Sequence, residues 1–579
     1  MDPHHTLDLL SVLLGTVITA FCLLSWGQIV LRFFGTSRES IQMNHAWIGM
    51  ASLISVISLI QLLMPIDWKM SLAVLLIALF NAYYYEKVSW ANLLSTIRQY
   101  IFRHPFISFT SFLGIVLLSS GALLAPGNYD SGLYHFTSIA WLNQHPITLG
   151  LGNLHGRLAF NQSYFQLIAL LNVYPLWNKG YSVAGPLFIY LGIASVVFSD
   201  LRKICFGRYL QAALLILLAL LCIDISAPTP DLAISVLQIA IFTQLLQLLW
   251  QRNQHQNLVP NDLVAFACQC FLISTMKLSG AAFGLSALAL VLFMHPNFSK
   301  TYLKKFKKLL YLLIIFSCIH IFRSYLLSGT PFYPMGFGAL SGADWVIPID
   351  TIQSELNWTY SWARRPGFEV AEVLGNWNWF KPWLKTLPIG ALFCILIASI
   401  CVPWYLFLRN KQLTTSNGMY RKFIHTAGLA FMPLLITTLL WFLTVPDIRF
   451  LGVIHQLLAI FSVWLTLVLM KLRHITTVFG VREGQYIFAA HDNHILWFGF
   501  LSAVIIMISL QIIRPGIFSG SESLPITELK TSSTLSGLII YSPASGEQCG
   551  NATLPCTPYF NSALKEYRLN NWWLMYSVK

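Results

Sequence analysis

Residues 231–250 read DLAISVLQIAIFTQLLQLLW, a run of twenty residues whose only charged side chain is the first. A helix of this length is about 30 Å long, which matches the hydrocarbon core of a bilayer. Similar runs recur along the 579-residue chain, in which 56% of residues are hydrophobic and only 10% are charged. Soluble proteins carry about 25% charged residues. The pattern predicts an all-α polytopic membrane protein and excludes a disordered chain, a coiled coil and an ordinary soluble enzyme.

We expect about fourteen transmembrane helices. The apolar segments lie at 9–31, 46–64, 70–85, 105–125, 181–199, 210–225, 231–250, 259–276, 279–294, 309–328, 387–408, 423–444, 450–470 and 494–513. The expected organisation has three parts, which are N-terminal spans with a cytoplasmic linker (1–104), a transmembrane core with long outer loops at 126–180 and 329–386 (105–513), and a small outer C-terminal domain (514–579).

The basic residues predict the orientation, because short cytoplasmic loops collect Lys and Arg. If the N-terminus lies outside, every inner loop carries at least one basic residue, and most of the 36 Lys and Arg fall in these loops. The net charge of +14 then reflects membrane topology, and no nucleic-acid partner is expected. We expect a multi-pass protein of the bacterial inner membrane with both termini in the periplasm. The opening Met-Asp-Pro-His-His lacks the basic region of a cleavable signal peptide.

Two of the ten cysteines differ from the rest in their surroundings. Cys549 and Cys556 lie in a polar segment, whereas the others lie in or beside apolar runs. Because the tail is expected in an oxidising compartment, we predict a disulfide between them. No CxxC pair occurs, so the cysteines do not predict a zinc site.

Asp130 comes just after the fourth apolar segment, where Pro-Gly-Asn ends the helix and leaves a carboxylate at the membrane surface. Residues 136–143, which follow His135, are expected to form a short interfacial helix anchored by Trp141. The carboxylate is interpreted either as a helix N-cap or as a general base beside a lipid-borne substrate.

Polar residues gather again later in the first long loop. Asn153, His155 and Arg157 lie close together, and Asn161 follows. The group is read either as a turn or as a set of ligand contacts.

Three more candidates lie near outer helix ends. Asp231 follows Pro230 and is either a helix cap or a site residue. Lys277, in a tight connection, is either a snorkelling anchor or a site residue. Arg323 lies within an apolar segment, where an unpaired charge is costly, so we expect it to face a polar cavity.

Asp447 and Arg449 occupy a tight outer loop and, taken alone, suggest a structural ion pair. Together, the candidates supply carboxylates and cations on one side of the membrane. Cations suit a lipid-linked phosphate, and a carboxylate suits proton transfer or a divalent metal such as Mg or Mn. No Walker loop, HExxH, GxSxG or dinucleotide fingerprint occurs in a credible setting, which disfavours a soluble nucleotide donor.

With these residues noted, the chain resembles the GT-C superfamily, integral-membrane glycosyltransferases that use polyprenyl-phosphate sugars. The shared features are many spans, a long outer loop with Asp130 just past a helix end, interfacial helices in that loop and a small outer C-terminal domain. The resemblance implies that Asp130 is the catalytic carboxylate of an inverting enzyme. It also implies that Arg449, Asp447, Lys277 and Arg323 lie near the donor phosphate. No second acidic residue adjoins Asp130, so metal dependence stays open.

A second resemblance covers most of the chain. The stretches 153–161, 323–334 and 554–561 are similar to a group of uncharacterised bacterial membrane proteins, which brings no activity with it.

The expected function is sugar transfer from a polyprenyl-phosphate donor to a glycan, lipid or protein acceptor, with membrane lipids as the other partners. A polysaccharide polymerase or ligase acting on lipid-pyrophosphate glycans is the first alternative, because it would use arginines more than carboxylates. A transporter or flippase of an anionic or lipid-linked substrate is the second, although no internal repeat is visible. A binding or assembly protein without chemistry is the third. The sequence predicts no oligomeric state.

Overall fold

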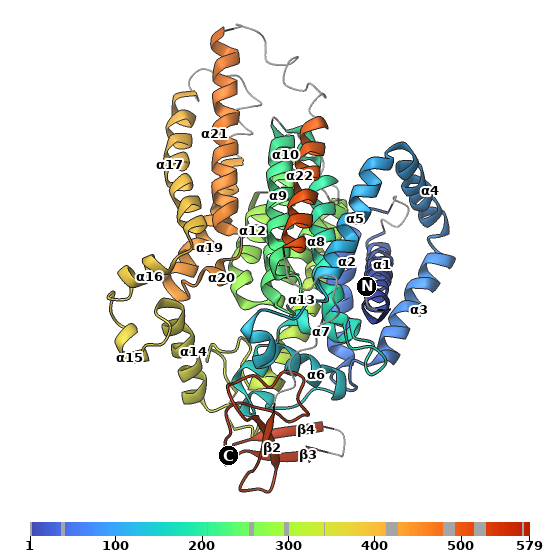
Figure 1. The fold of residues 1–579 in the computed structure, drawn as a ribbon. Helices are drawn as coiled ribbons and strands as arrows, with labels where there is room; N and C mark the ends of the chain where they lie inside the picture. The colour runs from blue at the N-terminus through green and yellow to red at the C-terminus, as the bar shows by residue number, and fades with distance from the viewer. Residues whose placement is uncertain are drawn as a thin grey trace.

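The computed structural model describes residues 3–35, 41–204, 206–253, 260–294, 300–340, 342–412, 427–478, 493–513, 528–569 and 573–578. The described chain is mostly helical, and every apolar segment predicted from the sequence contains a helix (Figure 1). These helices are α1 (Pro3–Phe33), α2 (His45–Ile60), α3 (Trp68–Tyr84), α5 (Pro105–Gly121), α8 (Gly180–Val197), α9 (Gly207–Leu220), α10 (Pro230–Asn253), α11 (Pro260–Met276), α12 (Ala281–Met294), α13 (Lys300–Ser328), α17 (Ile389–Gln412), α19 (Phe431–Thr444), α21 (Ile454–Val478) and α22 (Asn493–Ile512).

Seven further helices belong to the loops and connections. They are α4 (Lys87–Arg103), α6 (Phe136–Gln144), α7 (Ser163–Leu171), α14 (Ile349–Arg364), α15 (Val370–Val373), α16 (Phe380–Thr386) and α20 (Ile448–Leu451). Among the described residues, eight helices are long and apolar enough to cross a membrane, and a ninth crossing results if α4 and α5 count as one bent span. Five shorter apolar helices, of 10–17 residues, accompany them. By length and composition, this is the architecture of a polytopic membrane protein.

Helix α4 replaces part of the expected cytoplasmic linker. Its residues form a helix because apolar side chains such as Leu93, Ile97 and Ile101 recur at helical spacing. None of its residues is buried, and its axis turns by 109° relative to α5. The turn lies between Arg103 and Pro105, and Pro105 opens α5 at the position where a helix needs no backbone donor.

Small residues and buried amides fix the packing of the bundle. A Cβ on Gly49 of α2 would lie 1.8 Å from the carbonyl oxygen of Leu23, so glycine allows α1 and α2 to approach closely. Helix α10 lies at the centre of the bundle, because its apolar stretch is completely buried by other parts of the protein. Its Gln238 donates to the Leu451 carbonyl at 3.1 Å and accepts from the Val453 amide at 2.8 Å. This clamp fixes the connection between α20 and α21.

The C-terminal tail forms two antiparallel hairpins. Strand β1 (Leu529–Ser533) pairs with β2 (Ile539–Pro543), and β3 (Lys565–Leu569) pairs with β4 (Trp573–Ser577). The all-α prediction is therefore wrong for the tail, which forms four short strands of five residues each. The first residues of the predicted domain, 514–527, lie outside the described part of the chain.

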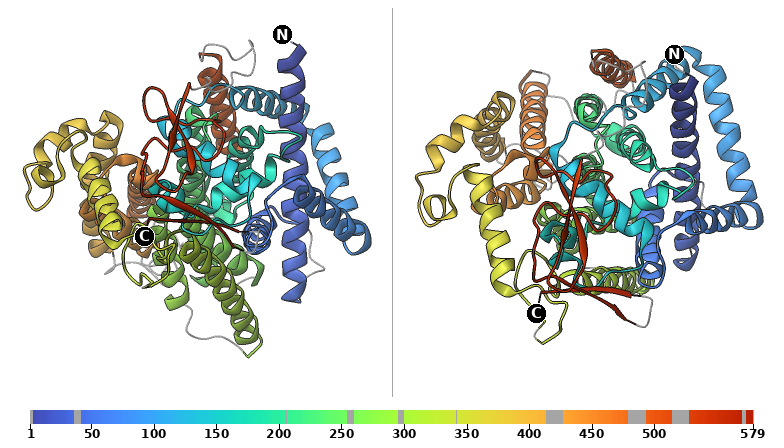
Figure 2. Two further views of the ribbon diagram at one scale, coloured as in Figure 1. Left: turned by 90° about the horizontal axis from the view of Figure 1, so that it is seen from below. Right: turned by 60° about the horizontal axis from the view of Figure 1, so that its bottom comes forward.

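The tail covers the first long loop (Figure 2). The backbone of Leu149 in that loop accepts from the amide of Tyr576 at 2.9 Å and donates to the carbonyl of Leu574 at 2.9 Å. Leu149 therefore pairs with β4 in the way that a residue of a neighbouring strand does. Trp141 is only 4% exposed and its ring contacts that of Tyr576, at a centroid distance of 6.0 Å. The expectation of Trp141 as a membrane anchor is wrong, because β4 covers the ring.

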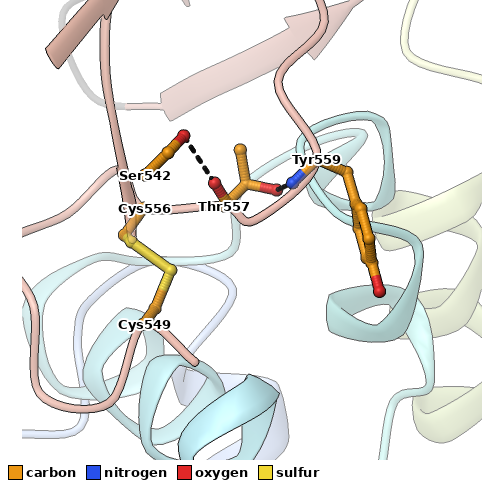
Figure 3. The surroundings of a disulfide bond; sticks show 5 residues. All are labelled: Ser542, Cys549, Cys556, Thr557 and Tyr559. Carbon is orange, nitrogen blue, oxygen red and sulfur yellow. Dashed lines mark hydrogen bonds between the residues drawn. A yellow bond between two sulfur atoms is a disulfide. The ribbon is translucent and has the colours of Figure 1, made fainter. Parts of the chain in front are cut away.

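The predicted disulfide between Cys549 and Cys556 is present (Figure 3). The segment after it is held by two hydrogen bonds. Thr557 accepts from the Ser542 hydroxyl at 2.8 Å through its carbonyl, and from the Tyr559 amide at 3.2 Å through its hydroxyl. The disulfide closes a loop within the irregular segment after β2, and the Ser542 bond ties that segment to β2.

Candidate functional site

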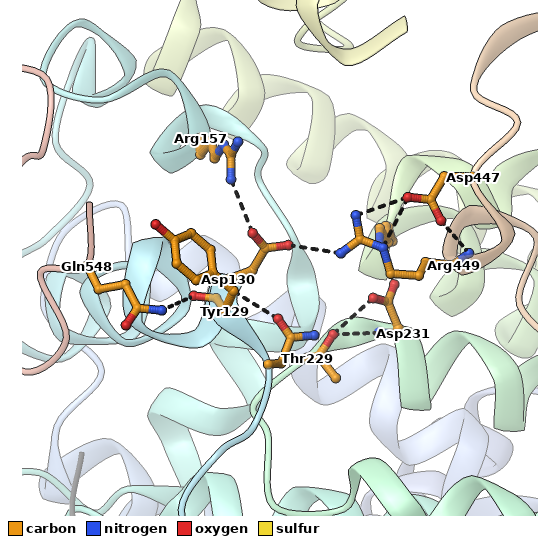
Figure 4. A network of polar contacts seen from close by, with 10 residues as sticks. Tyr129, Asp130, Arg157, Thr229, Asp231, Asp447, Arg449 and Gln548 are labelled. Carbon is orange, nitrogen blue, oxygen red and sulfur yellow. Dashed lines mark hydrogen bonds and ion pairs between the residues drawn. The ribbon is translucent and has the colours of Figure 1, made fainter. Parts of the chain in front are cut away.

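The carboxylate of Asp130 lies between two arginines that are far apart in the sequence (Figure 4). Its Oδ1 is 3.2 Å from an Arg157 nitrogen, and its Oδ2 is 3.7 Å from an Arg449 nitrogen. The Asp130 side chain is 28% exposed, so a substrate could reach it. The first long loop and the α19–α21 connection therefore meet at this carboxylate.

The Asp130 side chain does not cap the helix that follows it. Asp130 precedes a five-residue π-helix, Ser131–His135, and its side chain makes no capping hydrogen bond. The turn before it is stabilised by Asn128, whose side-chain oxygen accepts from the Asp130 amide at 2.9 Å. The capping interpretation of Asp130 is wrong, because its carboxylate points to the arginines. Short π-helices often mark functional sites.

Arg449 is shared between two carboxylates. Asp447 accepts from the Arg449 amide at 3.0 Å, and its Oδ2 accepts from Nε at 3.2 Å and from a terminal nitrogen at 3.1 Å. The structural ion pair predicted for this loop is confirmed, and Arg449 reaches Asp130 in addition. Burial lowers the pKa of Arg449, but Asp447, Asp130 and Asp231 outweigh burial and leave that pKa above its usual value.

A second ion pair lies beside the first. Lys277 donates to Asp231 at the start of α10, and its ammonium group lies 4.7 Å from the centre of the Phe450 ring, next to Arg449. Lys277 is therefore not a snorkelling anchor, because a carboxylate on the neighbouring helix pairs with it. The hydroxyl of Thr229 accepts from the Asp231 amide at 3.3 Å, so Thr229 caps α10 and Asp231 does not.

These six side chains form what we call the Asp130 cluster. Its members are Asp130, Arg157, Asp231, Lys277, Asp447 and Arg449. The three carboxylates and three cations balance in charge, so the empty cluster needs no counter-ion.

Two of the three histidines in the first long loop, His135 and His155, are buried. Burial lowers the pKa of His135 to about 3. Burial, with the nearby charge of Arg157, lowers the pKa of His155 to about 3. The His155 ring contacts that of Tyr559 from the tail, at a centroid distance of 5.3 Å. Neither histidine can carry a positive charge toward a phosphate near neutral pH.

Arg157 has a second set of neighbours, which the sequence did not indicate. Its guanidinium lies 5.1 Å from the Trp358 ring of α14 and 5.8 Å from the Tyr134 ring. Glu355, one turn before Trp358, is close enough for Arg157 to influence it. Burial raises the pKa of Glu355 and the charge of Arg157 opposes that rise. Glu355 was missed because a single acidic residue in a long polar loop looks solvated, although the apolar spacing within 349–364 indicates a helix with a buried face.

The other predicted residues lie outside the Asp130 cluster. Asn153 donates to the carbonyls of Trp345 and Tyr576, at 2.9 and 3.1 Å, and so joins the two long loops to the tail. Asn161 donates to the His320 carbonyl of α13 at 2.9 Å. Arg323 is 5% exposed and lines a cavity, which confirms the prediction that it faces polar surroundings.

The tail reaches the Asp130 cluster through residues that the sequence analysis also missed. Gln548 donates to the carbonyl of Tyr129 at 2.8 Å, and Gly550 donates to the carbonyl of Gly132 at 2.8 Å. Both contacts flank Asp130 in the chain, and the disulfide lies next to them (Figures 3 and 4). The tail thus holds the segment that carries the carboxylate.

The donor set fits a divalent metal poorly. Across the described ranges, no three His, Cys, Asp or Glu side chains come together as a metal site. Asp130, Asp231 and Asp447 each bind a cationic side chain instead. We therefore assign no step to a metal.

The fold and the site together define a class of protein. It is a polytopic helical membrane protein in which two long loops and the tail surround a charged cluster. Within it, the chain belongs to the family described as "Domain of unknown function (DUF8201)", which matches residues 9–455. The match includes all six residues of the Asp130 cluster and ends before the β-strands of the tail. No curated protein and no solved structure matches the chain.

Proposed function

We propose that the protein is a GT-C-type glycosyltransferase that moves a sugar from a polyprenyl-phosphate donor to a glycan, lipid or protein acceptor. The observation that carries the proposal is the partly exposed Asp130 carboxylate, held between Arg157 and Arg449 without a capping role. Carboxylates in such positions act as general bases, and arginines bind phosphate through paired donors.

In this mechanism, Asp130 takes the proton of an acceptor hydroxyl. The acceptor oxygen forms a bond to the anomeric carbon, the bond from that carbon to the phosphate oxygen breaks, and the lipid phosphate leaves with the electron pair. Attack from the side opposite the leaving group inverts the configuration. Arg449 stabilises the charge that develops on the departing phosphate.

The distances around Arg449 indicate which of its contacts a donor phosphate would replace. Arg449 binds Asp447 through two nitrogens at 3.2 and 3.1 Å, but its distance to Asp130 is longer, at 3.7 Å. The Asp130 contact is the one that a phosphate would replace most easily. When Arg449 turns to the phosphate, the Asp130 carboxylate is released from this contact, and its Oδ2 is free to accept a hydrogen bond from the acceptor hydroxyl.

The proposed setting is the bacterial inner membrane, with fourteen spans and both termini in the periplasm. The contacts between segments support this orientation. The two long loops, the tail and the connections that carry Asp231, Lys277 and Arg449 meet in one place. If the chain crosses the membrane fourteen times, these loops, connections and the tail all emerge on the same side of it. Several basic residues used for the orientation, such as Arg38 and Arg482, lie outside the described residues.

The proposal is tested with purified full-length protein in liposomes that contain a polyprenyl-phosphate sugar and a panel of acceptors. Release of polyprenyl phosphate should depend on acceptor. Asp130→Asn keeps the size of the side chain and removes its charge, so transfer should fall by roughly 10² to 10⁴, the usual scale for general-base catalysis.

Asp350→Asn is the matched control, because Asp350 is an exposed residue on α14. It should leave transfer unchanged. Near-normal transfer by the Asp130→Asn protein would remove Asp130 from the mechanism.

A further inference from the structure

A second polar site lies next to the Asp130 cluster. A cavity is enclosed by α2, the first long loop and α13, with an empty volume of about 470 Å³ including its open mouth. The space between the side chains themselves accommodates a group of a few atoms. Its polar lining consists of Gln61, Ser138, Trp141, Thr148, Arg157, Asn161, Gln162 and Arg323.

Arg323 is a buried cation without a carboxylate partner in the described part of the protein. Its terminal nitrogen donates to the Gln61 side-chain oxygen, and no acidic side chain forms an ion pair with it among the described residues. Its Nε is buried and has no hydrogen-bond partner. A guanidinium buried in this way carries a large desolvation penalty unless a negative group compensates it.

Other groups in the same cavity also lack partners. They include a donor, the indole N–H of Trp141, and two acceptors, the side-chain oxygens of Asn161 and Gln162. All three residues are at most 8% exposed. Buried polar groups are normally hydrogen-bonded. Together with the buried Arg323, these three residues place donors and acceptors around one cavity that a bound molecule can satisfy.

The unpartnered groups define the chemistry of that occupant. Arg323 and Trp141 can donate to an oxyanion, and the amide oxygens of Asn161 and Gln162 can accept from hydroxyls. Water could satisfy the hydrogen bonds, but it would leave the charge of Arg323 uncompensated. The Asp130 cluster differs here, because each of its cations already has a carboxylate.

We propose that this cavity binds a small oxyanion, a carboxylate or a phosphate, carried on a hydroxylated molecule. Arg157 connects it to the Asp130 cluster, since Arg157 lines the cavity and also binds Asp130. Binding in the cavity requires neither glycosyl transfer nor the base role of Asp130, so it can be tested separately.

The test measures binding to full-length protein in nanodiscs by calorimetry, with inorganic phosphate, glucuronate and uncharged glucose as the probes. At least one anion should bind, and glucose should bind at least ten-fold more weakly. Phosphate preference would identify a phosphate group as the natural occupant, and glucuronate preference would identify a sugar carboxylate. Either result supports the site. Failure of both anions to bind overturns the proposal.

Three variants locate the binding in the cavity. Arg323→Gln should weaken anion binding at least ten-fold. Gln162→Glu should do the same without lowering the melting temperature, because it supplies an internal carboxylate and a partner for Arg323. Arg365→Gln removes a cation that stacks on Phe368 and lies outside the cavity, and it should leave binding unchanged. Unchanged binding by Arg323→Gln and Gln162→Glu together would show that the anion binds elsewhere.

Discussion

At the scale of single residues, the role of a charge depends on a partner that the sequence does not reveal. The pairing of Asp447 with Arg449 was predictable, because two residues in a tight loop can meet without help from the fold. The pairing of Asp231 with Lys277 was not, since 46 positions separate them and each had a plausible solitary role. Glu355 was missed for the same reason. Its neighbour Arg157 comes from another loop.

Arg449→Ala should weaken binding of a polyprenyl-phosphate donor by about ten-fold or more, which is the scale of one lost charge-assisted hydrogen bond to phosphate. Titration of the purified variant with the donor measures this. Arg449→Lys should recover only part of the loss, because lysine lacks the paired donors of a guanidinium.

The matched control is Arg568→Ala, which removes a 72% exposed arginine of the tail and should not change donor affinity. Normal donor affinity in Arg449→Ala would place the phosphate elsewhere in the protein.

At the scale of elements, apolar run length predicted where helices form, because each of the fourteen runs contains one, and eight or nine of the described helices are long and apolar enough to cross a membrane. In lipid, a run of about twenty apolar residues can pair its backbone N–H and C=O groups in few ways other than as a helix. Secondary structure was predicted less well in segments whose residues are only partly buried. Helix α4 was read as a linker because it carries Lys87, Arg98 and Arg103, and the tail strands are only five residues each. Trp141 was misplaced because nothing in its own segment indicates that β4 covers it.

The disulfide should stabilise the tail by local chain entropy. Cys549 and Cys556 are seven positions apart, and a loop of this size corresponds to about 2.5 kcal/mol. Replacing both residues by serine should therefore increase hydrogen exchange in β2, whose Tyr541 bonds to the chain on both sides of Cys556. Exchange in α10 should stay unchanged.

Cys318→Ser is the control, because Cys318 is an exposed free thiol on α13. Equal exchange in β2 for both serine variants would mean that the hairpin needs no disulfide.

At the scale of the whole molecule, the sequence predicted which segments share a side of the membrane but not which of them touch. Asp130, Asp231 and Arg449 were all expected on the outer face, and their contact depends on how α5, α10 and α20 are arranged. Arg323 is the exception. Its burial among polar groups was predictable, because a charge within an apolar helix needs such surroundings.

The proposed orientation predicts that cysteines introduced one at a time at Gly537 and Gly367, in a background without the accessible thiols Cys318, Cys394 and Cys401, react with a membrane-impermeant maleimide from the outside of intact cells. Both positions are open, because a Cβ on either glycine would meet no atom within 4 Å. A cysteine at Ser95 on α4 should react only after the membrane is permeabilised. Labelling of the Gly537 position only after permeabilisation would reverse the orientation, and with it the side on which the Asp130 cluster is placed.

The glutamine clamp of α10 has a consequence for how the protein is assembled. Gln238 bonds to residues 213 and 215 positions later in the chain. During synthesis, α10 therefore enters the membrane long before its partners exist, with an amide that lipid cannot satisfy. Until Leu451 and Val453 arrive, α10 has to be shielded by the helices made before it or by the insertion machinery. The helix at the centre of the finished protein therefore completes its hydrogen bonding only after residue 453 has been made.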